Sequence, residues 1–258
     1  MTEVNELLGL WQGVLWAHFV VFLRVGPVIS LFPGFGETSV PVRIKLALAL
    51  VMTVAIAPIL VFETTPFQVD LPNLAWLTVT ETGIGLIIGI GIRLFLLALQ
   101  TAGAIAGQAT SLSQILGSAG IEPIPAMGQL LVIGGFALAM MMGLHVRLAE
   151  TLVLSYRLFP VADLPDAAAV SEWGVRQVAG AFGLAFTLAA PFVLASVLYN
   201  LTLGIINRAM PQLMVVFVGA PVITGLGLVI LFLLAPTLLT LWVEALARFM
   251  ANPFGTIR

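Results

Sequence analysis

Two charged side chains are candidates for chemistry because they lie deep inside one apolar run. Glu81 and Arg93 interrupt the segment from Leu74 to Gln100 and are twelve residues apart. On a helix this separation is about 18 Å along the axis, so the two side chains cannot pair with each other. A charge in an apolar segment of membrane length needs a partner or a wet cavity. We therefore expect each to be a buried charge with its own partner.

The two histidines are the other candidates for acid–base or metal chemistry. His18 could relay protons, but no carboxylate lies near it in the sequence, which favours a packing role. His145 has only neutral residues three and four positions further on, which argues against a helical metal site. The absence of cysteine excludes disulfides, thiolate nucleophiles and sulfur-ligated metals. With no recognisable catalytic set or phosphate loop, the sequence predicts neither an enzyme nor a cofactor site.

Arg208 is the only charge between two long uncharged runs, residues 177–207 and 209–243. Pro211 cannot continue a helix, so the sequence predicts a turn here. Four polar or small residues lie on one face of the helix before this turn, at i, i+4, i+7 and i+8: Asn200, Gly204, Asn207 and Arg208. This polar stripe could face a partner or a wet cavity, or it could pack against the chain's own neighbours. The spacing alone favours packing within the chain.

The segment from Gln108 to Gln129 is unusually polar for its apolar surroundings. It collects glycines, prolines, polar side chains and one carboxylate, among them Gly117, Gly120, Pro123, Pro125, Thr110, Ser111, Ser113, Gln114, Ser118 and Glu122. Irregular backbone at membrane depth is tolerated only where protein or water surrounds it. Two interpretations are equally open, a re-entrant or lumen-facing loop and a plain cytoplasmic loop between helices.

The composition places the whole chain in a membrane. Of its 258 residues, 60% are hydrophobic and only 9% are charged, which is too apolar for a soluble domain. The net charge is −2 and the ten Lys and Arg residues are scattered, which argues against binding of nucleic acid. The sequence predicts an all-α integral membrane protein of kinked helices and hairpins, with about six long apolar segments in contact with lipid.

Charges in the predicted loops indicate how the first spans are oriented. The first run, Leu7 to Leu23, is marginal for a span unless it continues past Arg24, and no basic signal-peptide region precedes it, so we expect it to be retained. A break from Phe32 to Arg43 follows, and the second span covers Leu46 to Phe62. The basic residues before this span predict a cytoplasmic loop, and the acidic residues after it predict an outside loop.

The second half of the chain begins with an apolar run from Leu130 to Leu144. After Arg157 the acidic residues Asp163, Asp166 and Glu172 predict a second outside loop. The last uncharged run, 209–243, would reach about 52 Å as a straight helix, which exceeds one bilayer crossing. We therefore expect it to be tilted, kinked or folded back.

Several motifs resemble one family in order and over nearly the whole length. The most specific is Asn200-Leu201-Thr202-Leu203-Gly204, then Asn207-Arg208, Pro211-Gln212 and Phe217-Val218-Gly219-Ala220-Pro221. Upstream are Phe32-Pro33, Phe35-Gly36, Val40-Pro41, Arg43 and Lys45 before Leu46-Ala47-Leu48, and Pro58. Together they resemble the flagellar biosynthesis protein FliR and its type III secretion counterparts, the SctT proteins.

The resemblance implies a subunit of the export gate in the bacterial inner membrane, at the flagellar basal body. Such a subunit assembles as a hetero-oligomer with FliP-type and FliQ-type subunits, contacts an FlhB-type subunit and passes unfolded flagellar proteins outward. Residues 1–175 would be similar to FliP and residues 176–258 to FliQ. Partner contacts would fall at the helix turn formed by Asn200, Gly204, Asn207, Arg208, Pro211 and Gln212.

In that family the segment between the middle helices supplies a plug loop that closes the pore. By position it corresponds to Ser111 to Met127, and its candidate residues are Ser111, Ser113, Gln114, Gly117, Gly120, Glu122, Pro123, Pro125 and Met127. A loop of glycine, proline and serine could fill a lumen and move aside for substrate. The alternative is a small-solute transporter with broken helices and buried charges, which would predict internal repeats that we do not find.

Overall fold

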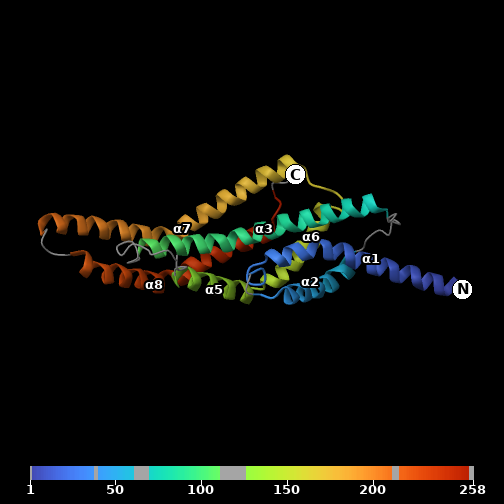
Figure 1. Cartoon of the computed structure of the whole chain (residues 1–258), viewed down its shortest axis with the longest axis horizontal. Helices are drawn as coiled ribbons and strands as arrows, with labels where there is room; N and C mark the ends of the chain where they lie inside the picture. The colour runs from blue at the N-terminus through green and yellow to red at the C-terminus, as the bar shows by residue number, and fades with distance from the viewer. Residues whose placement is uncertain (1, 38–39, 61–69, 111–125, 211–214, 256–258) are drawn as a thin grey trace. The chain divides into compact units, whose positions relative to one another are not determined.

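The computed structural model describes residues 2–37, 40–60, 70–110, 126–210 and 215–255 (Figure 1). All regular structure in these ranges is helical. The elements are α1 (Thr2–Leu31), α2 (Val42–Ile56), the 3-10 turn η1 (Ala57–Ile59), α3 (Leu71–Ala109), α5 (Ala126–Met141), α6 (Leu144–Leu158), α7 (Ala167–Ala209) and α8 (Val215–Ala251).

Five of the described helices are long and apolar enough to cross a membrane. They cover Trp11–Leu31, Val42–Ile59, Leu71–Ala109, Ala167–Ala209 and Pro221–Ala251. Helices α5 and α6 pass the same test only as a pair joined at a bend of 70°, which gives up to six spans in the described ranges if the pair counts as one. The predicted all-α, multi-pass fold with about six apolar segments is therefore confirmed.

The breaks between helices follow from proline and glycine at the expected positions. Helix α1 ends at Leu31, two residues before Pro33, and Gly34 takes a positive φ of 82° that favours glycine. Gly143, with a φ of 80°, separates α5 from α6 in the same way. Helix α1 continues through Arg24, as a full span requires.

The connection between α6 and α7 is shorter than its charges predicted. Phe159 is extended before Pro160, which ends α6. Asp166 then accepts a hydrogen bond from the Ala169 backbone N–H at 2.9 Å and caps the start of α7. Glu172 lies inside α7, so its predicted place in the loop was wrong. The cap at Asp166 begins the helix before this charge is reached.

The chain divides into two compact units, each built from separate stretches of sequence. The first contains Met1–Arg93, Gly143–Val175 and Arg248–Arg258, and the second contains Leu94–Met142 and Arg176–Ala247. This division differs from the division into residues 1–175 and 176–258 that the family resemblance implies. The latter concerns similarity to other subunits and stays a prediction.

The core of the first unit is a helix-to-helix seam. The most buried apolar side chains of α1 are Val21, Val25 and Val28, and those of α3 in this unit are Leu77, Ile84, Ile88 and Ile92. The members of each set are three, four or seven residues apart, which places each set on one helix face. Near the end of the chain, Phe254 packs edge-on against Phe159 with ring centroids 5.0 Å apart.

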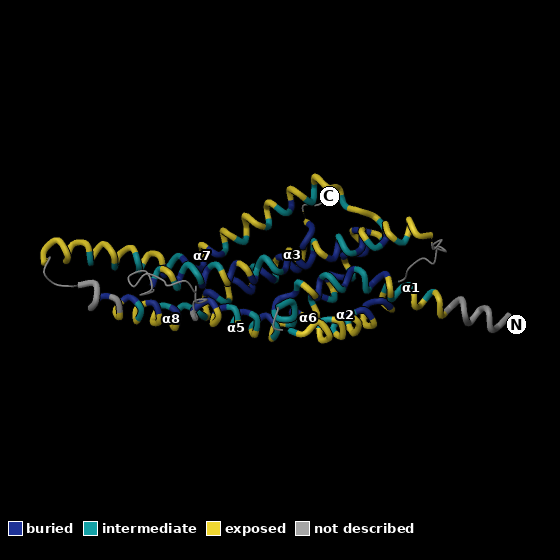
Figure 2. The backbone as a smooth tube through the Cα atoms, viewed as in Figure 1, coloured by how far each residue is buried: buried dark blue, intermediate teal, exposed yellow. Residues whose placement is uncertain are grey.

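The core of the second unit is centred on Trp242 of α8, which is 1% exposed. Its indole N–H donates to the Phe95 carbonyl at 2.8 Å. A Cβ on Gly135 of α5 would lie 2.6 Å from Leu99 and 3.4 Å from the Trp242 ring. Small residues on α5 therefore let α3 and α8 pack closely on it. Figure 2 shows α7 exposed along much of its length.

Three glycines of α3, Gly85, Gly89 and Gly103, pack within the chain. Gly85 lies against the backbone of Arg24, and a Cβ on Gly89 would lie 3.0 Å from Leu31, so both serve the seam between α1 and α3. Gly103 lies against Gly128 of α5. At these three positions glycine lets segments of the same chain approach closely.

Two neighbouring glycines of α3, one at the seam and one away from it, provide a matched test. In Gly85→Ala the added Cβ would overlap the Arg24 carbonyl, and we expect a loss of about 1–3 kcal/mol of unfolding free energy. Gly83→Ala is the control, because nothing lies within 4 Å of that position. This control should gain up to about 1 kcal/mol from helix propensity. Thermal unfolding of the detergent-purified variants measures both, and equal stability would contradict the close approach.

Candidate functional site

The most polar buried site joins α1, α3 and α6. Arg24 and Glu81 are both 0% exposed and form a two-pronged ion pair. Arg24 Nε donates to Glu81 Oε2 at 2.8 Å, and Nη2 donates to Oε1 at 3.1 Å. The guanidinium also lies 3.6 Å from the centroid of the Tyr156 ring. We call Arg24, Glu81, Ser155 and Tyr156 the charge cluster.

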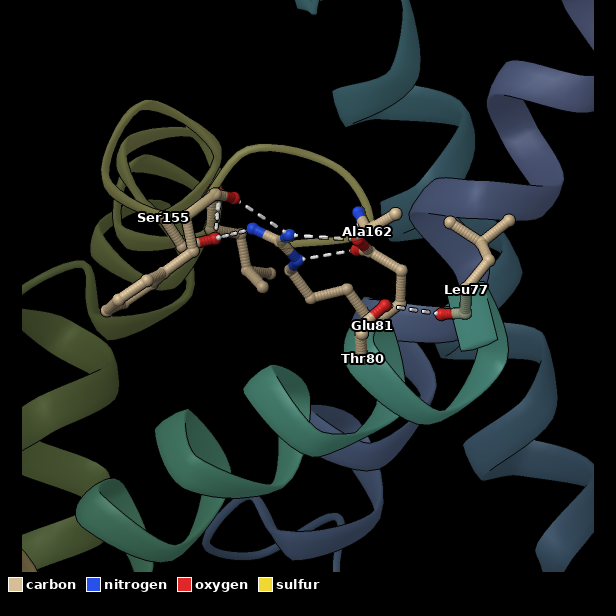
Figure 3. A network of polar contacts seen from close by, with 8 residues as sticks. Leu77, Thr80, Glu81, Ser155 and Ala162 are labelled. Carbon is tan, nitrogen blue, oxygen red and sulfur yellow. Dashed lines mark hydrogen bonds and ion pairs between the residues drawn. The ribbon is translucent and has the colours of Figure 1, made fainter. Parts of the chain in front are cut away.

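The charge cluster also reaches the connection between α6 and α7. Arg24 Nη1 donates to Ser155 Oγ at 3.0 Å, and Nη2 donates to the Phe159 carbonyl at 3.0 Å. The Ala162 N–H donates to Glu81 Oε1 at 3.2 Å. Figure 3 shows Glu81, Ser155 and Ala162 converging on these contacts. The arrangement neutralises two charges and has the character of a structural site rather than a reactive one.

The other titratable candidates lie apart from this cluster. Arg93 is half-buried on α3. His18 holds its Nδ1 at 2.7 Å from the Val14 carbonyl of its own helix, so this nitrogen must donate. His145 is exposed. Within the described ranges, no three His, Asp or Glu side chains gather closely enough to hold a metal ion.

Sequence reasoning treated Arg24 only as an interruption of the first apolar run. A usable signal was present, because Arg24 and Glu81 are opposite charges in different apolar segments and each needed a partner. Ser155 and Tyr156 gave no such signal. Their role depends on how α6 lies against α1, which spacing along the sequence does not reveal.

The described residues that flank the polar segment lie together in the second unit. The Thr110 hydroxyl contacts the Met127 sulfur at 3.7 Å. Thr224 of α8 donates to the Thr110 carbonyl at 3.1 Å, and a Cβ on Gly227 would lie 2.7 Å from the Thr110 side chain. Residues 110 and 127 are therefore neighbours. The candidate plug residues from Ser111 to Pro125 lie outside the described residues, and Met127 is 8% exposed.

The polar stripe of Asn200, Gly204, Asn207 and Arg208 is exposed on the end of α7. A Cβ on Gly204 would meet nothing within 4 Å. In the part of the chain that the structure describes all four residues are exposed, which does not support the interpretation that the stripe packs against the chain's own neighbours. The remaining contact candidates, Pro211 and Gln212, lie outside the described residues.

The predicted turn after the polar stripe agrees with the helix bounds. Helix α7 ends at Ala209 and α8 begins at Val215. A Cβ on Gly219 would overlap the hydroxyl of Tyr199, so the two helices lie against each other beside the turn. The end of α7 is thus one arm of a helical hairpin, with its polar stripe left open.

These features define a multi-pass helical membrane protein with an internal ion pair. The described flanks of its polar segment are in contact, and the polar stripe on α7 is exposed. The family model described as bacterial export proteins, family 1, matches residues 15–249. The chain belongs to this family, which confirms the resemblance found in its motifs.

Curated relatives carry the same family relationship. The chain is 34% identical to the flagellar biosynthetic protein FliR of Caulobacter vibrioides, over 87% of this chain and 90% of the relative. It is 29% identical to the FliR protein of Escherichia coli, over 88% of this chain and 87% of the relative. It is 23% identical to FliR of Bacillus subtilis, over 96% and 98% of the two chains.

Proposed function

We propose that this chain is a subunit of the flagellar export gate in the bacterial inner membrane. It would form part of the pore that passes unfolded flagellar proteins, and its polar segment would close that pore. The observation that carries the proposal is the match to the bacterial export family over residues 15–249, with relatives named as flagellar biosynthetic proteins. The proposal assigns the chain no enzymatic activity.

The flanks of the polar segment support its role as a plug. Because Thr110 and Met127 contact each other, the two described ends of this segment lie at one place. Thr224 and Gly227 hold this base from α8. A loop anchored at a narrow base can occupy a lumen and move aside without disturbing the helices that carry it. Gating would then be a physical displacement that leaves no bond changed.

The exposed polar stripe supports assembly with other subunits. An asparagine pair and an arginine on a membrane helix are costly beside lipid, so protein or water should cover them. Gly204 lies between them and lets a second helix approach closely. We assign this face to a FliQ-type or FlhB-type partner.

Deleting Ser113 to Glu122 tests the plug directly. The deletion leaves Thr110 and Met127 in place, so the helices should still fold and assemble. We expect the assembled gate to change from no measurable resting ion current to a sustained current, because nothing then fills the pore. Planar-bilayer recording of the assembled complex measures this current.

The matched control is Gly183→Ala, which alters α7 where nothing lies within 4 Å. Its resting current should equal that of the unmodified gate. An unchanged current in the deletion variant would refute the plug.

A further inference from the structure

The Arg24–Glu81 pair does more than neutralise two buried charges. Helix α6 ends at Leu158, and the last carbonyl groups of a helix lack partners within it. Arg24 supplies a donor to the Phe159 carbonyl and another to the Ser155 hydroxyl. A cation near a helix C-terminus also interacts favourably with the helix dipole. Arg24 therefore acts as a cap that reaches α6 from a different helix.

Glu81 holds the next part of the same connection. Its Oε1 accepts the Ala162 N–H at 3.2 Å, while the Trp76 indole donates to the Ala162 carbonyl at 3.1 Å. Ala162 has a φ of 64°, which is uncommon for a residue with a Cβ. Both polar groups of this backbone unit are thus held by α3. These two hydrogen bonds stabilise the strained backbone conformation of Ala162.

The energy of the Arg24–Glu81 ion pair indicates that its main effect is to position the α6–α7 connection rather than to stabilise the fold. Removing two charges from water costs about as much as their attraction returns, so a buried ion pair is weak evidence for stability. Breaking it by removing one partner is costly, because a buried charge then stands alone. An apolar pair of similar size could match its stability. Apolar side chains could not donate a hydrogen bond to the Phe159 carbonyl or accept one from the Ala162 N–H.

We propose that Arg24 and Glu81 form a positional latch, which fixes the path of the chain between α6 and α7 against α1 and α3. The latch contributes little net stability. Its effect is to select one conformation of residues 159–162 from those the connection could otherwise adopt. This inference is independent of the proposed function, because it concerns contacts within the first unit alone.

Three variants of the full chain test the latch. Arg24→Met leaves Glu81 buried and unpaired, and Arg24→Met with Glu81→Met replaces the pair by apolar side chains. Arg93→Met is the matched control, because it removes a half-buried charge from α3, the helix that carries Glu81. Each protein is purified in detergent, and its thermal midpoint is measured together with hydrogen exchange of the peptide covering residues 159–166.

The single Arg24→Met variant should melt well below the control. The double variant should recover to within about 3 °C of the unmodified chain. Exchange at residues 159–166 in this stable double variant should nevertheless be faster by about tenfold or more, because the Ala162 N–H has lost its charged acceptor. The control should keep the original exchange rate.

Two results would overturn the latch. Unchanged exchange in the double variant would show that the pair does not hold the connection. A double variant that melts as low as the single variant, or fails to fold, would show that the pair is needed for stability itself.

Discussion

Replacing Trp242 by alanine should destabilise the second unit by about 3–5 kcal/mol. The indole is 1% exposed and packs against the position of Gly135, and its N–H donates to the Phe95 carbonyl. The substitution removes the largest fully buried side chain of the unit and leaves a cavity between helices that glycine keeps close together. Thermal unfolding of the detergent-purified chain measures the loss.

Two control variants separate packing from hydrogen bonding at Trp242. Trp242→Phe keeps an aromatic ring but loses the donor, and should cost roughly 1 kcal/mol through the bond, with a further cost for lost volume. Trp11→Ala removes a tryptophan that is 63% exposed and should change the stability by no more than about 0.5 kcal/mol. A Trp242→Ala variant as stable as Trp11→Ala would contradict this account of the core.

Gly204→Leu should leave the isolated chain folded but reduce its incorporation into the gate by about tenfold or more. Nothing in the described part of the chain lies within 4 Å of a Cβ at this position, and leucine is a better helix former than glycine. A partner helix that packs against the polar stripe would instead meet the added side chain. Quantitative co-purification of the gate subunits with the variant measures the loss.

Gly13→Leu is the control for this effect, since it makes the same change on α1, also with nothing within 4 Å. It should assemble normally. Full assembly of Gly204→Leu would show that no helix approaches the stripe closely, and the partner contact would have to lie elsewhere.

The helices could be predicted because apolar runs of membrane length have few alternatives to the helix. The break after Leu31 and the turn after Ala209 were both marked by proline, which constrains the backbone locally. The bounds were less accurate where a polar side chain determined them. Asp166 starts α7 early, so that Glu172 is helical despite its charge.

Contacts between distant residues were much harder to predict. The sequence showed that Glu81 needs a partner, but any basic residue in another apolar segment would have satisfied this requirement. The choice of Arg24 follows from the seam between α1 and α3, where Gly85 lets the backbones meet.

The sequence of one helix does not determine whether its polar stripe is covered by another element. Periodicity grouped four residues from Asn200 to Arg208 on one face, and all four are exposed in the part of the chain that the structure describes. Whether a face is covered depends on every other element, including other proteins. Under the proposed assembly with other subunits, a partner helix would cover this face.

The most direct test of the central claim is to purify the tagged chain gently from its own bacterium and identify what accompanies it. An export-gate subunit should be recovered with several copies of two other small membrane proteins, the FliP-type and FliQ-type subunits. Recovery of the chain alone or as a homo-oligomer, with transport of a small solute after reconstitution, would contradict the account.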